Sequence, residues 1–97
     1  MTNEEIWNIG LEERTDELSK LQSEYDRLDV ECRKAEFEKD MYARLRDVNN
    51  AMLYKQKFSE KYEKCARASE KLTKQKNALE NEISVLKKEI YYSNSLM

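Results

Sequence analysis

Side chains able to carry out catalysis are scarce in this sequence. It has no histidine and only one glycine, so it lacks the usual general base and the glycine-rich loops that hold phosphates. Acidic pairs such as Glu80 and Glu82 lie in highly charged stretches that are typical of solvated helix surfaces. A solvated carboxylate has no cause for a raised pKa, so we expect no catalytic residues and no enzyme activity.

The two cysteines, Cys32 and Cys65, are the other reactive groups. They are 33 residues apart, and the absence of histidine leaves too few ligands for a zinc site. Two cysteines also make a poor disulfide framework. We therefore expect two reduced thiols that act as small apolar side chains, with no bound metal and no cofactor.

The elements that position these side chains are expected to be helices. The chain of 97 residues has no proline, and 39% of its residues are charged. Alanine, glutamate, lysine, leucine and arginine together number 49, about the half that is typical of coiled coils and long helices. Thr2 and Glu5 have the spacing of a capping box, which predicts a helix start there. The predicted fold class is all-α, a long amphipathic helix that forms a coiled coil.

Two heptad seams run along the chain, the first over residues 7–35 and the second over residues 58–97. The seam residues that we expect to mediate oligomerisation are Leu11, Leu18, Leu21, Leu28, Phe58, Tyr62, Cys65, Leu72, Leu79, Ile83, Leu86 and Ile90. In the last two heptads isoleucine occupies position a and leucine position d, which favours a parallel two-stranded coiled coil.

The two seams do not share a register. The a positions Cys32 and Tyr62 are 30 residues apart, which is four heptads plus two residues, so residues 36–57 contain a register break. We favour one continuous helix that makes the whole chain, residues 1–97, a single coiled-coil segment. The alternative is a bend at Asn49 and Asn50, because asparagine tolerates the left-handed conformation that ends helices.

The flanks of the first seam bear on the choice of partner. A parallel copy in register would place Glu24 opposite Asp29, and these like charges disfavour that pairing. A homodimer, a different helical chain with basic flanks and an antiparallel arrangement therefore stay open as alternatives. Residues 1–50 have a net charge of −6 and residues 51–97 a net charge of +4, so the total of −2 makes nucleic acid an improbable partner.

Two surfaces are candidates for docking a protein client. In the region of the register break an apolar stripe contains Phe37, Met41, Leu45, Val48 and Met52, and Tyr54 widens it. In the second half Lys57, Lys64 and Lys71 all occupy position c and form a basic stripe. The predicted docking residues are Phe37, Met41, Met52, Tyr54, Lys57, Lys64 and Lys71.

The longest apolar run is Ala51 to Tyr54, so we expect no membrane span and no signal peptide, and a cytoplasmic or nuclear location. The heptad pattern resembles the coiled-coil segments of spindle-pole, kinetochore, vesicle-tether and motor-adaptor proteins. The expected function is a non-enzymatic oligomerisation or scaffold segment in such cytoskeletal or tethering machinery. The alternatives are an obligate subunit of a heteromeric helical bundle and a binding module, such as an exchange factor or cargo adaptor.

Overall fold

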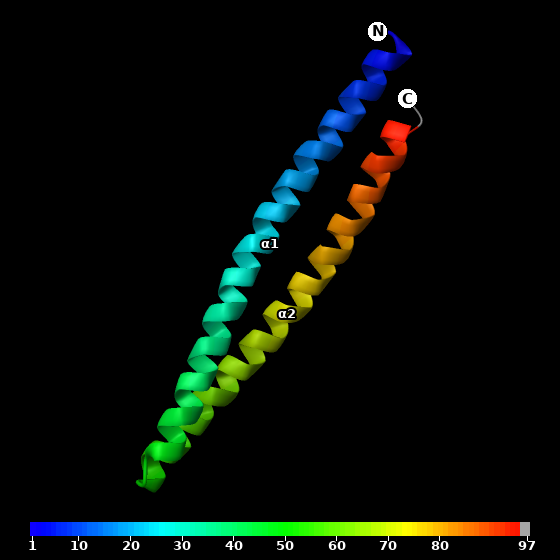
Figure 1. Ribbon diagram of the computed structural model, residues 1–97. Coiled ribbons are helices and arrows are strands. Elements are labelled where there is room, and N and C mark those ends of the chain that lie inside the picture. The colour runs from blue at the N-terminus through cyan, green and yellow to red at the C-terminus, as the bar shows by residue number, and fades with distance from the viewer. Residues whose placement is uncertain (96–97) are drawn as a thin grey trace. The chain divides into compact units, whose positions relative to one another are not determined.

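The computed structural model describes residues 1–95, which form two helices, α1 (Asn3–Val48) and α2 (Met52–Ser95), with no strand among them (Figure 1). The expected all-α fold class is confirmed. The expectation of one continuous helix is wrong, because helical structure stops at Val48 and resumes at Met52. The alternative, a bend at Asn49 and Asn50, is confirmed.

The start of α1 is stabilised by the capping box that the sequence predicts. The backbone N–H of Glu5 donates to Thr2 Oγ1 at 3.2 Å, and the N–H of Thr2 donates to Glu5 Oε2 at 3.3 Å. These two bonds satisfy N–H groups that have no partner within the helix.

The loop between α1 and α2 ends the first helix by a different mechanism from the expected one. No residue in the described part of the chain has a positive φ, so asparagine does not adopt the left-handed conformation. Instead Asn49 Oδ1 accepts a hydrogen bond from the N–H of Ala51 at 3.2 Å. The carbonyl of Ala51 then accepts from the N–H of Lys55 at 3.0 Å, in the first turn of α2. The side chain of Asn49 therefore forms a turn that leads into α2.

The chain divides into two compact units. The terminal unit combines Met1–Arg27 with Asn77–Met97, and the loop unit comprises Leu28–Lys76. Each unit contains one segment of α1 and one antiparallel segment of α2. Antiparallel pairing is the ordinary result when a short loop joins two helices.

The terminal unit has an apolar interior. Leu79, Ile83 and Leu86 of α2 are buried, and Leu18 and Leu21 of α1 are half-buried. At the end of this unit Trp7 Nε1 donates to the carbonyl oxygen of Ser93 at 3.2 Å. An exposed ion pair, Arg14 Nε to Glu89 Oε2 at 3.7 Å, also joins the two helix segments.

Small side chains predominate in the interior of the loop unit. Its buried residues are Leu28, Cys32, Ala35 and Ser69. Nearer the loop, aromatic rings and cations fill the interface between the helices. The rings of Tyr42 and Phe58 stack with centroids 6.3 Å apart. The guanidinium of Arg46 lies 5.2 Å from the ring centroid of Tyr62. Lys61 Nζ lies 5.5 Å from the ring centroid of Tyr42. Each such cation–π contact contributes about 0.5–1 kcal/mol at an exposed site.

The two seams differ in register by two positions, and this difference falls in the loop between α1 and α2. In α1 the partly shielded positions continue at heptad spacing through Lys39, Tyr42 and Arg46, and they avoid the more apolar Met41 and Leu45. The two seams therefore need no common register, because they lie on separate antiparallel helices. Side chains that we expected to face a parallel copy are shielded by the other helix of the same chain.

No helix in residues 1–95 has the length and apolar character needed to cross a membrane.

Candidate partner-binding site

Well-exposed apolar side chains of the loop unit lie on the outer face of α1. Phe37 is 71% exposed and Val48 is 76% exposed, while Val30 is also well exposed. Their spacing, with Met41, is seven, four and seven residues, so they recur on one face of the helix. Including the charged positions at the same spacing, we define the outer seam as Val30, Lys34, Phe37, Met41, Arg44 and Val48.

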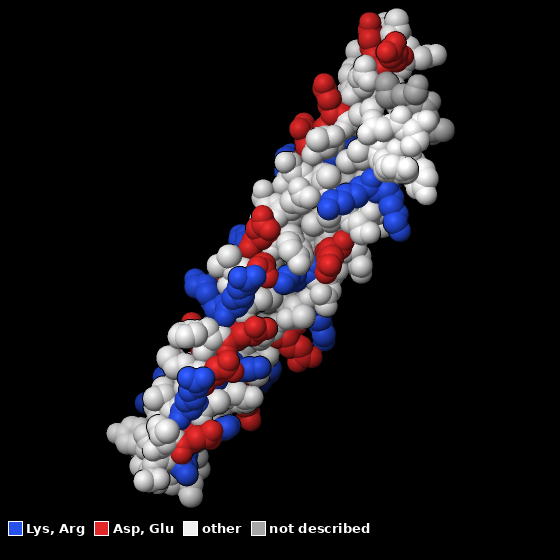
Figure 2. Space-filling view, in the orientation of Figure 1, with Lys and Arg blue, Asp and Glu red and all other residues white. Residues whose placement is uncertain are grey.

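A second apolar cluster lies where the loop meets α2. Met52, Leu53 and Tyr54 occupy the first turn of α2, and all three are exposed. In Figure 2 the surface at the loop end is mostly uncharged, whereas acidic and basic side chains alternate over the adjoining surface of the visible face. The outer seam and this cluster both belong to the loop unit.

The predicted apolar docking residues are therefore accessible. Phe37 and Met41 are neighbours on α1, and Met52 and Tyr54 lie in the first turn of α2. Sequence reasoning missed Val30 as a member of the same face. Its distance of seven residues from Phe37 was the signal that could have found it.

The predicted basic stripe lies on the exposed surface of α2. Lys57, Lys64 and Lys71 are exposed, and none of them makes an ion pair within 4.0 Å in the described part of the chain. Two neighbouring cations are paired within the helix, Arg67 with Glu63 at 3.8 Å and Lys74 with Glu70 at 3.6 Å. The exposed apolar side chains near these lysines are Leu53 and Tyr54, one helical turn before Lys57, whereas the outer seam has exposed apolar side chains along its whole length and is the stronger candidate site.

The predicted oligomerisation residues are shielded to different degrees within the chain. Leu28, Leu79, Ile83 and Leu86 are buried, and Leu11, Leu18, Leu21, Phe58, Tyr62, Cys65, Leu72 and Ile90 are half-buried. Their role in oligomerisation stays a prediction. What the structure gives them is contact with the other helix of their own unit.

A charged contact fixes the alignment of the helices in the loop unit. Lys76 Nζ donates to Asp29 Oδ1 at 2.6 Å, and Arg33 Nε lies 3.2 Å from Asp29 Oδ2. The hydrogen bond from Lys76 lowers the pKa of Asp29 below its ordinary value, with a smaller contribution from the charge of Arg33. The position of Lys76 in the seam, which weakens an apolar interface, thus selects one register for the antiparallel pair.

The cysteines show no sign of activation. Both are free thiols, and Cys32 is buried as a small apolar side chain in the seam. Cys65 Sγ donates to Glu38 Oε2 at 3.8 Å. Burial, followed by the negative charge of Glu38, raises the pKa of Cys65, so less of the reactive thiolate forms.

The described residues also lack a cluster of metal ligands. No group of three or more cysteine or acidic side chains is placed to hold a metal ion within residues 1–95. The outer seam instead offers apolar groups and cations to another molecule.

Comparisons with known proteins add no further constraint. No family model, curated protein or solved structure matches the chain. Its function is therefore inferred from its own residues and their arrangement.

Proposed function

We propose that this chain is a non-enzymatic protein–protein assembly module, a helical hairpin whose outer seam binds another polypeptide. One observation carries this proposal. Apart from Leu28, the buried side chains of the loop unit are small, namely Cys32, Ala35 and Ser69, while Phe37 and Val48 remain outside. Apolar side chains on a contiguous exposed face are typical of an interaction surface.

The energetic reason is the free energy that burial of this face would release. Fully burying a side chain of the size of phenylalanine, methionine or valine contributes about 1.5–3 kcal/mol. In the hairpin itself Phe37 and Val48 are 71% and 76% exposed, so folding gains little of this burial free energy. A partner helix placed on the outer seam would shield both side chains.

A second candidate is a binding module that docks a globular client through the apolar cluster at the loop. The observation in its favour is that Met52, Leu53 and Tyr54 are consecutive and all exposed. Such a cluster fits a pocket on a client better than it fits a long helix–helix interface. Association with cytoskeletal, spindle, kinetochore or tethering machinery stays a prediction from the heptad pattern.

The test is the size of the assembly that the full chain forms in extracts of its native cells. Phe37→Glu places a charge at the centre of the outer seam, where burial of an unpaired carboxylate is unfavourable. We expect this variant to elute from a sizing column at a smaller size than the unaltered chain. Gln56→Glu introduces the same charge on an exposed surface of α2 and should leave the elution unchanged.

Two results decide between the candidates. If Met52→Gln with Leu53→Gln reduces the assembly while Phe37→Glu does not, the client is bound at the loop cluster. If the unaltered chain in the extract elutes at the size of a single chain, the proposed assembly function is wrong.

A further inference from the structure

On the basis of the proposed assembly function, we infer that the partner of the outer seam is a second copy of this chain, which receives the seam in an acidic groove of its terminal unit. Two surfaces with matching chemistry support this inference. One presents cations on either side of apolar side chains, and the other presents carboxylates on either side of apolar side chains.

The outer seam supplies the cationic half of the match. Phe37 and Met41 are adjacent on its surface, and Lys34 and Arg44 stand on either side of them. Lys34 and Arg44 are ten residues apart, which is about 15 Å along a helix. Both cations are exposed, so they are accessible to a docked partner.

Two outer seams would not pair well with one another. An antiparallel pair centred between Phe37 and Met41 would place Lys34 opposite Arg44 of the copy. A parallel pair in register would place each cation opposite itself. Because like charges across a helical interface disfavour pairing, the seam requires a surface with carboxylates at these places.

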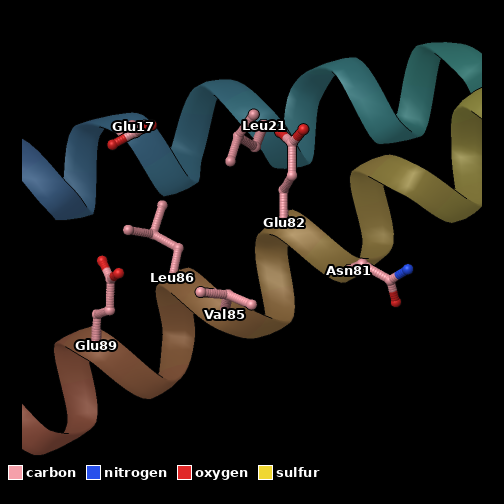
Figure 3. Close-up of a pocket in the computed structure, with 7 residues that line it drawn as sticks. All are labelled: Glu17, Leu21, Asn81, Glu82, Val85, Leu86 and Glu89. Carbon is pink, nitrogen blue, oxygen red and sulfur yellow. The ribbon is translucent and has the colours of Figure 1, made fainter.

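The terminal unit contains such a surface, a groove between its two helix segments. It is lined by Glu17 and Leu21 of α1 and by Asn81, Glu82, Val85, Leu86 and Glu89 of α2. Figure 3 shows Glu17 and Glu89 towards one end and Glu82 towards the other. The side chains of Leu21, Val85 and Leu86 lie between these carboxylates and form an apolar floor.

The spacing of charges in the groove suits the seam. Glu82 and Glu89 are seven residues apart, about 10 Å along α2. The side chains of lysine, arginine and glutamate are long and flexible, so they can cover the remaining difference from the 15 Å between the seam cations. Phe37 and Met41 would then meet the apolar floor.

The charges of the two units agree with this match. The loop unit carries 13 basic and 9 acidic side chains, a net charge of +4. The terminal unit carries 5 basic and 11 acidic side chains, a net charge of −6. Encounter of the loop unit of one copy with the terminal unit of another is therefore electrostatically favoured.

Existing ion pairs present little obstacle to docking. Lys34 Nζ is 3.9 Å from Glu31 Oε1, and Arg14 Nε is 3.7 Å from Glu89 Oε2. The side chains of both pairs are exposed, and pairs of this kind contribute little to stability. They can be exchanged for contacts with the partner.

The same surface is poorly suited to an anionic membrane or to nucleic acid. Glu31, Asp40 and Asp47 lie beside the outer seam on α1. These carboxylates would be repelled by phosphate groups that approach Lys34 and Arg44. A protein surface with carboxylates placed opposite the cations avoids this repulsion.

The test uses the purified full chain and measures its mass by sedimentation equilibrium over a concentration series. We expect the mass to rise above that of a single chain, and the association to weaken when salt increases from about 50 mM to about 500 mM. A chain that stays monomeric up to about 1 mM protein would overturn the inference.

Charge-swap variants then locate the contact. Lys34→Glu with Arg44→Glu reverses the seam, and Glu17→Lys with Glu82→Lys reverses the groove. Each pair alone should weaken self-association about tenfold or more, because like charges then face each other. All four substitutions in one chain restore opposite charges and the original net charge, and should return the association constant to within about threefold of the starting value.

Controls separate this contact from general charge effects. Arg67→Glu with Lys74→Glu changes the net charge as much as the seam swap but lies on the exposed surface of α2, so it should weaken self-association less than the seam swap does. Circular dichroism should show unaltered helicity for every variant. The inference would be overturned if the seam swap and this control weakened self-association equally. It would also be overturned if the fourfold variant kept its helicity but did not recover self-association.

The outcomes also distinguish this inference from the proposed function. If the purified chain is monomeric but Phe37→Glu still reduces the assembly in extracts, the outer seam binds a different polypeptide and only the second-copy inference is wrong. A photoreactive side chain at Phe37 would then identify what lies on the seam. A cross-link from this position to lipid or nucleic acid, with no cross-link to protein, would contradict both the second-copy inference and the proposed function.

Discussion

The terminal unit and the loop unit share one architecture but differ in the side chains that fill their interiors. In the terminal unit Ile83 and Leu86 point inward and are buried. In the loop unit small side chains such as Ala35 occupy the interior, while Phe37 and Val48 are exposed. An antiparallel helix pair can thus bury large apolar side chains in one part and leave them exposed in another.

The difference is greatest at equivalent seam positions. The seam of the terminal unit has Ile83, whereas that of the loop unit has Ser69 and the Lys76–Asp29 ion pair. Polar groups in a helical interface contribute less to stability than apolar ones but reject wrong alignments. The terminal unit therefore supplies stability, and the loop unit supplies register and leaves the outer seam exposed.

The largest effect is expected from Leu86→Ala in the terminal unit. Leu86 is 6% exposed, and removing a buried leucine side chain lowers the free energy of unfolding by about 2–4 kcal/mol. Val85→Ala is the matched control, because Val85 is 57% exposed and should change stability by about 0.5 kcal/mol or less. Urea denaturation measures both, and equal losses would contradict an interior made by Leu86.

A smaller, pH-dependent effect is expected from Asp29→Asn in the loop unit. The pKa of Asp29 is below its ordinary value of 3.8 in the folded chain, so its ionised form favours folding. This stability is fully present above about pH 4 and is lost as the pH falls through the lowered pKa. The variant should melt at a lower temperature than the unaltered chain at pH 7, and the difference should shrink as the pH falls below about 4. A constant difference across this range would be inconsistent with the charged contact.

A change in reactivity without a large change in fold is expected from Glu38→Gln. Burial and the charge of Glu38 raise the pKa of Cys65 above its ordinary value of 9.0. Removing the charge should therefore lower that pKa and speed alkylation of Cys65 at pH 8. The rate is measured by mass spectrometry with Cys32 as the internal reference. Unchanged kinetics would show that Glu38 does not influence the thiol.

The smallest effect on stability is expected at the outer seam. Phe37→Gln replaces an exposed side chain with another helix-forming residue, so it should change the free energy of unfolding by about 0.5 kcal/mol or less. Urea denaturation of the single chain tests this. A loss of the size expected for Leu86→Ala would show that Phe37 belongs to the interior, and the contrast between the two units would disappear.

Much of the fold follows from local rules that the sequence displays. The capping box at Thr2 and Glu5 and the helical nature of both halves could be predicted, because hydrogen bonds and heptad spacing act over a few residues. The exposed residues Phe37 and Met41 were also identified as docking candidates. Val30 was missed because its exposure depends on which face of α1 turns towards α2.

The choice between a continuous helix and a bend could not be made from local rules. Asn49 and Asn50 are compatible with both, and the seam residues can pair with another chain or with their own. The position of the second helix also decides which side chains are shielded. Tyr42 and Arg46 are partly shielded, whereas the more apolar Met41 and Leu45 are exposed.

The order of residues along the chain is enough to establish that it is helical, where its first helix begins and which positions carry apolar side chains. The antiparallel pairing of the helices, the contact of their seams within one chain and the exposure of the outer seam depend on the packing of distant segments. The physical reason is range: capping and helix propensity depend on neighbours within a turn or two, whereas burial depends on which distant segment supplies the opposing surface.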